Sequence, residues 1–178
     1  IMSCRSVQTL RRAALAAGLL CALLAAGPAR AQTEALVSVS PEYQLAYLGD
    51  EFSVQVRIDD VQALYAFDVT LSFPPDLLEA LSVTDEGFLA PGMGWQTIDN
   101  AAGTVSLVHT QMNPAEPVSG SGALFTVIFR ADVEGLDAAL SLSSVTLSDR
   151  DGVVIPGGTR DGLVRLGDYQ VFLPAAFR

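Results

Sequence analysis

Apolar and polar residues alternate along most of the chain after residue 34, as they do in half-buried β-strands. The segment 51–59 alternates at every step, with Phe52, Val54, Val56 and Ile58 on one phase. Because successive side chains of a strand point to opposite faces of a sheet, these four residues are expected to point inward.

The segment 65–73 has the same period and forms a second expected strand. Its inward phase is aromatic or aliphatic: Tyr65, Phe67, Val69, Leu71 and Phe73. Its outward phase is small and polar: Ala66, Asp68, Thr70 and Ser72. One face of this strand is therefore predicted to lie in a core and the other to be flat and solvent-facing.

Further strands are predicted where the alternation returns between turn residues. They are the segments 103–109, 124–131, 140–147 and 162–166, with weaker candidates at 35–40, 81–84 and 95–98. A slip at Ser143-Ser144 indicates a β-bulge, and the segment 77–81 after two prolines is read as one helical turn. Eight or nine short strands with little helical periodicity predict an all-β fold, an antiparallel β-sandwich.

The first 31 residues have the order of a secretory signal peptide. Arg5, Arg11 and Arg12 are followed by an apolar run over 13–26 and by Ala29-Arg30-Ala31, a small-x-small cleavage pattern. The apolar run is short for a membrane span, which needs about 20 residues. We therefore expect an exported protein, secreted or on the surface of a bacterial cell, with no membrane span in its mature chain.

Removal of that segment changes the chemistry that remains. Both cysteines, Cys4 and Cys21, leave with it, so the mature chain has no disulfide and no thiolate metal site. Six arginines and no lysine are left against twenty acidic residues, a formal charge of −14. Such a surface repels nucleic-acid phosphates and excludes nucleic acid as an expected partner.

In the order of the predicted strands, several segments between residues 37 and 166 resemble the motifs of cohesin domains. In chain order they are LGDEF at 48–52, the strand 61–71, FPPDLLE at 73–79, GALFTVIFRA at 122–131, LSDRDGVVIP at 147–156 and DGLV at 161–164. Pro74 stands where the family usually has Asp, and a proline suits the end of a strand.

This resemblance implies a nine-stranded jelly roll, a cohesin-like β-sandwich over 35–167 followed by a short apolar tail over 168–178. Family members bind dockerin modules through one sheet face, and they are best known from complexes that degrade plant polysaccharide. Asp68 falls where the family has an acidic residue that hydrogen-bonds the dockerin. The expected partner-binding residues are Ala66, Asp68, Thr70, Ser72, Ser106, Val108 and Thr110.

Catalytic and metal chemistry have little support in the sequence. His109 is the only histidine, it lies in the inward phase of its strand, and no serine or aspartate can be placed beside it. Asp149 and Asp151 resemble the start of a calcium loop, but the third acid and the downstream Glu are missing. We expect no enzyme and no cofactor, with calcium at Asp149 and Asp151 as a weak alternative to a plain hairpin turn.

Two functions follow from these expectations. The first is a protein-binding adaptor with a dockerin-type partner, linked to extracellular polysaccharide degradation or cell-surface assembly. The second is a carbohydrate-binding or cell-envelope module of the same fold, which would need coplanar exposed rings on a sheet. Trp95, Tyr43 and Tyr47 are the candidates for such rings.

The cleavage pattern generates a prediction about processing. Because Ala31 ends the small-x-small pattern, the exported protein should begin at Gln32. Mass spectrometry of the N-terminal peptide from the culture medium checks this, and a peptide that still contains residues 19–26 would contradict it.

Overall fold

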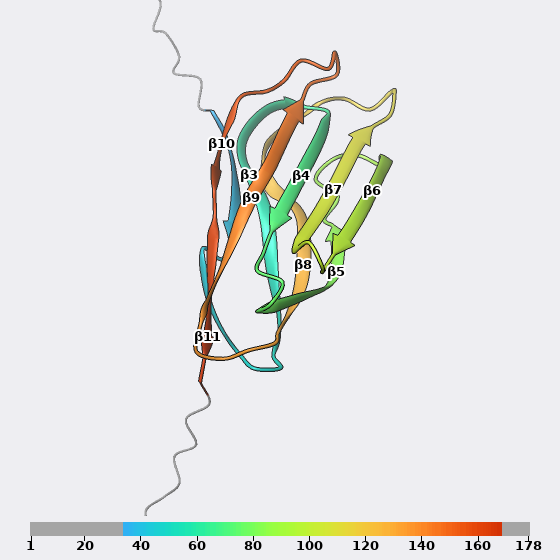
Figure 1. Cartoon of the computed structure of the whole chain (residues 1–178). Coiled ribbons are helices and arrows are strands. Elements are labelled where there is room, and N and C mark those ends of the chain that lie inside the picture. Colours follow the sequence, from blue (N-terminus) through green and yellow to red (C-terminus); the bar gives the residue numbers. More distant parts are fainter. Residues whose placement is uncertain (1–33, 169–178) are drawn as a thin grey trace, which may run out of the picture. The chain divides into compact units, whose positions relative to one another are not determined.

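The computed structural model describes residues 34–168, and every regular element in that range is a β-strand (Figure 1). The strands are β1 Ala35–Ser40, β2 Tyr43–Tyr47, β3 Glu51–Leu64, β4 Ala66–Ser72, β5 Leu78–Asp85, β6 Gly92–Asp99, β7 Thr104–Gln111, β8 Val118–Ala131, β9 Asp137–Ser148, β10 Gly157–Arg160 and β11 Gly162–Gly167. No helix in this part of the chain could cross a membrane.

The strands form two sheets that face each other. One sheet has five strands in the order β10-β1-β3-β8-β5, and the other has six in the order β2-β11-β9-β4-β7-β6. Neighbouring strands are antiparallel except for the pairs β1–β10 and β2–β11, which are parallel. The architecture is the predicted all-β sandwich.

The core lies between the sheets and is built by the inward phase of each strand. The predicted inward residues of β3 and β4 are buried, and so are their counterparts on β8, among them Phe125, Val127 and Phe129. Phe129 stacks on Phe52 of β3, and its ring meets the edge of Phe73 at 5.1 Å between centroids. These aromatic contacts join β3 and β8 of the five-stranded sheet to Phe73, the residue that follows β4 in the other sheet.

Several predicted strands are confirmed, and the structure corrects three details. The segment 77–81 is not a helical turn. Pro74 O accepts hydrogen bonds from the N–H groups of Leu77 and Leu78, and β5 begins at Leu78. The chain therefore makes one tight turn over 74–78 and continues from Leu78 as a strand, not as a helical turn over 77–81.

The strand count is eleven within the described residues, where nine were expected. The two short strands that the alternation did not reveal are β2 and β10, each an edge strand of its sheet. All four residues of β10 are exposed, and β2 buries one of its five. Without a buried phase, these strands leave no period-two pattern in the sequence.

Register shifts interrupt the pairing of several strands, among them β9 and β3. In β9, Ser144 lies opposite Thr70 and Leu142 opposite Leu71, so that Ser143 is the extra residue, as the slip in the sequence predicted. In β3 the register shifts after Ile58, and the strand continues to Leu64 beyond the predicted end at residue 59.

The irregular part of β3 is held by side chains of β8. Asp60 and Ala63 both have positive φ, and their N–H groups donate to the hydroxyl oxygens of Ser121 and Ser119. These bonds replace ladder hydrogen bonds that a regular strand would make, which explains why the strand persists where the alternation breaks. The predicted signal peptide over 1–31, and the tail after residue 168, lie outside the described residues.

The aromatic contacts of Phe129 generate a prediction about stability. Phe129 has no exposed surface and touches two other rings, so Phe129→Ala should lower the free energy of unfolding by about 3–5 kcal/mol. Urea unfolding followed by circular dichroism measures the change. Leu81→Ala, at a 36% exposed position of β5, is the control and should cost less than about 1 kcal/mol. Similar losses for the two variants would contradict this packing.

Candidate functional site

The candidate site is the outer face of the six-stranded sheet around β4. β4 is an inner strand with β9 on one side and β7 on the other. Phe67, Val69 and Leu71 are buried, so the alternate residues must face outward. The outer phase holds the four residues of this strand that the sequence singled out.

The register of β4 and β7 brings all seven predicted residues onto this face. Ala66 lies opposite Thr110, Asp68 opposite Val108, and Thr70 opposite Ser106. Ser72 lies opposite Thr104, which sequence reasoning did not include. Directly opposed residues of an antiparallel pair point to the same side, and the seven side chains therefore form one continuous surface.

The same register extends the surface to β6 and β9, whose contributions the sequence analysis missed. Trp95 lies opposite Val108, Met93 opposite Thr110 and Thr97 opposite Ser106. On the other side, Thr146 lies opposite Asp68 and Ser144 opposite Thr70. The alternation in β6 and β9 indicated which of their residues face outward. It did not show that these strands lie beside β7 and β4. We call these twelve residues the β4–β7 face: Ala66, Asp68, Thr70, Ser72, Met93, Trp95, Thr97, Ser106, Val108, Thr110, Ser144 and Thr146.

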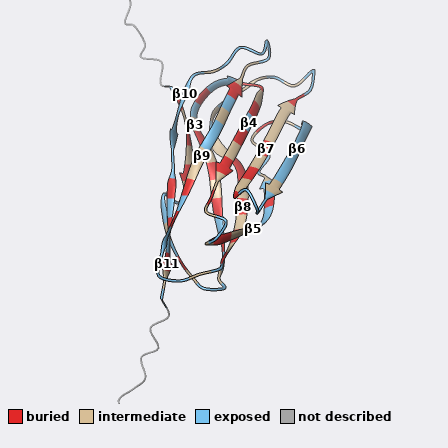
Figure 2. Cartoon of the chain, in the orientation of Figure 1, coloured by how far each residue is buried: buried red, intermediate tan, exposed pale blue. Residues whose placement is uncertain are grey.

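The β4–β7 face has an apolar end and a hydroxyl end. Trp95 and Met93 are 63% and 61% exposed on the edge strand β6, which Figure 2 shows as exposed along most of its length. At the other end the hydroxyl groups of Thr70 and Ser106 are 2.8 Å apart and hydrogen-bonded. Ser72 donates to Ser143 at 2.7 Å.

Asp68 lies between these two ends. It is the exposed residue of β4, and its carboxylate makes no hydrogen bond or ion pair with the described residues. A free carboxylate in the middle of a flat surface can accept hydrogen bonds from a partner without first breaking an internal bond. The face contains no basic residue to neutralise it.

The outer face of the five-stranded sheet carries a group of internally paired charges. Arg130 on β8 forms ion pairs with Glu79 and Asp132, which raise the pKa of its guanidinium, mainly through the hydrogen bond to Asp132. Glu86 accepts a hydrogen bond from Thr126 on the same sheet.

The three candidate rings for sugar binding do not form one platform. Trp95 is on β6 and Tyr43 and Tyr47 are on β2, the two opposite edges of the six-stranded sheet. Five strand spacings separate these edges, about 24 Å. Tyr43 is 60% exposed and Tyr47 is half-buried, so that β2 carries at most one freely exposed ring.

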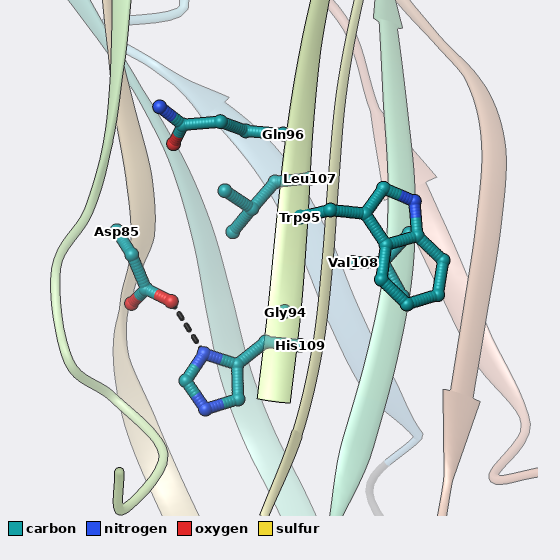
Figure 3. Close-up of a pocket in the computed structure, with 7 residues that line it drawn as sticks. All are labelled: Asp85, Gly94, Trp95, Gln96, Leu107, Val108 and His109. Atoms are coloured by element: carbon teal, nitrogen blue, oxygen red, sulfur yellow. Dashed lines mark hydrogen bonds and ion pairs between the residues drawn. The ribbon is translucent and has the colours of Figure 1, made fainter. Parts of the chain in front are cut away.

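Behind the β4–β7 face, His109 pairs with Asp85. The ring Nδ1 is 2.5 Å from Asp85 Oδ2, and Nε2 is 3.2 Å from the carbonyl oxygen of Ala90. Sequence reasoning did not find Asp85, because it belongs to β5 of the other sheet. Figure 3 shows this pair on one side of β6 and β7 and Trp95 on the other.

The hollow at this pair has a volume of about 270 Å³. Its lining residues are Asp85, Gly94, Trp95, Gln96, Leu107, Val108 and His109, none of which carries a hydroxyl or thiol nucleophile. With both ring nitrogens engaged, His109 is placed to hold structure together. The arrangement lacks the nucleophile that a histidine–aspartate pair would activate.

The loop that resembles a calcium site uses its first carboxylate internally. Asp149 Oδ1 accepts hydrogen bonds from the N–H groups of Asp151 and Val153, both at 2.9 Å. This is the geometry of a side-chain-capped turn. No group of three or more His, Cys, Asp or Glu residues within 34–168 could hold a metal ion.

With this geometry established, the chain was compared with known families and structures. The model of the cohesin domain family matches residues 37–164, most of the chain. The protein belongs to the cohesin domain family. The match covers β1 to the middle of β11 and therefore every strand of the β4–β7 face.

Solved cohesins have the same fold. A non-cellulosomal cohesin from Archaeoglobus fulgidus is 20% identical, with a TM-score of 0.64 over 76% of this chain and 93% of that one. The cohesin CaCohA2 from Clostridium acetobutylicum is 17% identical, with a TM-score of 0.67 over 78% and 94%. The sixth cohesin from Acetivibrio cellulolyticus scaffoldin B, solved with a dockerin, is 17% identical, with a TM-score of 0.65 over 75% and 99%. No curated protein matches this cohesin.

Proposed function

We propose that this cohesin binds a dockerin-bearing protein through the β4–β7 face, outside a bacterial cell. The observation that carries the proposal is the free carboxylate of Asp68 at the centre of a flat surface with exposed apolar side chains at one end. Family membership and the solved cohesin–dockerin complex support a protein partner. Export rests on the predicted signal peptide.

The chemistry of the face defines the partner's complementary surface. Trp95, Met93 and Val108 offer an apolar contact area at one end, where an aliphatic or aromatic side chain of the partner can be buried. Asp68 and the neighbouring hydroxyl groups offer hydrogen-bond acceptors and donors. The side chains between them are short, so that a helix can approach the sheet closely.

The net charge favours a partner with basic or donor-rich residues. The chain carries twenty acidic residues, and three of the five arginines within 34–168, Arg130, Arg150 and Arg165, are paired with acidic residues away from the face. The negative net charge of the chain increases the rate of association with a positively charged partner. Attachment of such a partner would serve cell-surface assembly or extracellular polysaccharide degradation, as the resemblance implies.

A binding role explains the site better than catalysis or sugar binding does. The hollow at His109 has no nucleophile among its lining residues, and the candidate rings lie at opposite edges of the sheet. The proposal is therefore a non-enzymatic module with a protein ligand.

Asp68 generates the test of this proposal. Asp68→Ala should weaken binding of a dockerin module from the producing organism by about 2 kcal/mol or more, roughly thirtyfold. The reason is that the donors of the partner would be buried without an acceptor. Thr70→Ala and Ser106→Ala should have smaller effects, because each removes one neutral hydroxyl group. Calorimetric titration measures the affinities, and thermal melts confirm that each variant is folded.

The matched control is Asp59→Ala. Asp59 is a half-buried carboxylate on β3 of the other sheet, and its side chain is likewise not engaged in an ion pair of the described residues. This variant changes the net charge by the same amount and should bind as the wild type does. Equal affinities of the Asp68 and Asp59 variants would remove the β4–β7 face as the binding site. Absence of binding to every such dockerin would refute the proposed partner.

A further inference from the structure

β2 is an edge strand of the six-stranded sheet, at the opposite side of that sheet from β6. Edge strands expose unpaired backbone N–H and C=O groups, and native proteins commonly protect them with charged residues, prolines or bulges. The other three edge strands, β5, β6 and β10, each contain at least one charged residue. β2 has the sequence YQLAY, without a charged residue or a proline, and its pairing with β11 has no bulge. The strand therefore lacks the usual protection against pairing with another strand.

The pairing with β11 determines which backbone groups of β2 face the free edge. Tyr43 lies opposite Leu163, whose N–H donates to the carbonyl oxygen of Glu42 at 2.9 Å. In a parallel pair a residue bonds to the two neighbours of the residue opposite it, so that the backbone groups of Glu42 and Gln44 face β11. The N–H and C=O groups of Tyr43 and Leu45 therefore face the free edge.

The last residue of β2 uses its backbone groups in a turn. The N–H of Tyr47 donates to Asp50 Oδ2 at 3.1 Å, and the carbonyl oxygen of Tyr47 accepts a hydrogen bond from the N–H of Asp50 at 2.9 Å. An added strand can therefore bond to Tyr43 and Leu45 but not to Tyr47. This restricts the registers in which β2 can pair.

The side chains beside this edge are apolar and exposed. Tyr43 and Leu45 are 60% and 50% exposed, and Leu163 on β11 is 37% exposed. All three are on the outward phase, because Ala46 of β2 and Val164 of β11 are buried on the inward phase. An added strand would remove part of this apolar surface from water while it pairs with the backbone.

Gln44, between Tyr43 and Leu45, is on the inward phase and has a buried amide oxygen. Its Oε1 has no hydrogen-bond donor among the residues that the structure describes. A buried acceptor without a donor destabilises the folded chain. An added strand that places a donor beside Gln44 would remove this cost.

A second copy of β2 meets these conditions in one register. In an antiparallel pair with its two-fold axis at Gln44, the backbone groups of Tyr43 bond to those of Leu45 in the second copy, and symmetry repeats these bonds. Tyr43 also packs against Leu45 of the second copy on the outward face. The two Gln44 residues lie directly opposite each other, with about 4.5–5.5 Å between Cβ atoms, where the amide group of one can donate to the oxygen of the other.

We propose that β2 is a self-association edge, to which a second copy of the chain adds its own β2 antiparallel with the two-fold axis at Gln44. The two six-stranded sheets then form one continuous sheet. Because this axis is perpendicular to the sheet, both β4–β7 faces are on the same side. Seven strand spacings, about 34 Å, separate the two β4 strands. The dimer presents two faces for partner binding, and only this use of the faces rests on the function proposed above.

The association is expected to be weak and reversible. A five-residue edge buries less than the roughly 1,000 Å² that a stable interface needs. The formal charge of the mature chain, −14, also makes two copies repel each other. We expect a dissociation constant of about 0.1–1 mM, which decreases as added salt screens the repulsion.

The first test measures self-association of the mature chain without a partner. Sedimentation velocity over a range of about 10 µM to 1 mM should show a reversible change from monomer to dimer. Leu45→Lys should weaken the dimer at least about tenfold, because it places a charge on the edge. Leu81→Lys is the matched control on the edge strand β5 of the other sheet and should associate as the wild type does. A wild type that stays monomeric in this range at high salt, or equal association of the two variants, would overturn the inference.

The second test locates the two-fold axis. Both cysteines precede residue 32, so that Gln44→Cys gives the mature chain a single thiol. On oxidation this variant should form a disulfide-linked dimer at least about tenfold faster than Gln96→Cys on the edge strand β6, because pairing raises the effective concentration of the thiols. Leu45→Cys should react more slowly than Gln44→Cys, because its two copies are diagonal neighbours. Equal rates at the three positions, or the fastest reaction at Leu45, would contradict the proposed pairing.

Amide hydrogen exchange distinguishes a second copy from another occupant of the edge. The N–H groups of Tyr43 and Leu45 should exchange more slowly as the protein concentration rises. Slow exchange that does not depend on concentration would mean that another segment of the same chain covers β2, and it would overturn the inference.

Dockerin binding is a separate measurement. Leu45→Lys should bind a single dockerin module as the wild type does, because three strand spacings separate β2 from β4. Loss of binding in this variant would contradict the separation of the self-association edge from the β4–β7 face. Absence of dockerin binding by the wild type would refute the proposed partner, whereas sedimentation and crosslinking would still decide whether β2 pairs with a second copy.

Discussion

Burial of the inward phase of β4 is the constraint on which the rest of the site depends. Phe67, Val69 and Leu71 are almost wholly excluded from solvent, and a shift of one residue would exchange them for Asp68 and its neighbours. The free energy of the core therefore fixes which side chains face outward. Because β4 lies between β7 and β9, the same constraint aligns the outward phases of three strands.

The fold supports a flat face without help from disulfide bonds. Both cysteines lie in the first 31 residues, and the sandwich is held by its apolar core and by aromatic contacts such as those of Phe129 with Phe52 and Phe73. Short hydroxyl side chains cover much of the outer surface of β4 and β7. They satisfy one another by hydrogen bonds, as Thr70 and Ser106 do, and leave Asp68 available.

The sequence was sufficient to predict strands whose alternate residues are buried. It was insufficient to predict strands that bury few or none of their residues. The alternation over 51–59 and 65–73 predicted which residues of β3 and β4 are inside. The same rule could not detect β10, whose residues are all exposed, and the prolines before Leu77 suggested a helical turn where a tight turn leads into β5. Period alone does not distinguish an exposed edge strand from a loop.

The sequence predicted only part of the candidate site, because alternation within a strand does not show which strands are neighbours. Outward residues of β4 and β7 could be named from their phase, but Trp95 and Thr146 required the pairing of strands distant in sequence. The contact of His109 with Asp85 crosses from one sheet to the other, and no local pattern encodes it. Phase within a strand is a local property, whereas neighbours across strands and sheets depend on topology.

The measurement that tests the account most directly is the footprint of a bound dockerin module on the cohesin, mapped by changes in its backbone amide NMR signals. We expect the largest changes in β4 and β7 around Asp68 and Val108, with further changes in β6 around Trp95 and in β9 around Thr146. The amides of β1, β3 and β8 should be little affected. A footprint centred on the five-stranded sheet, or on the edge strand β2, would contradict the account.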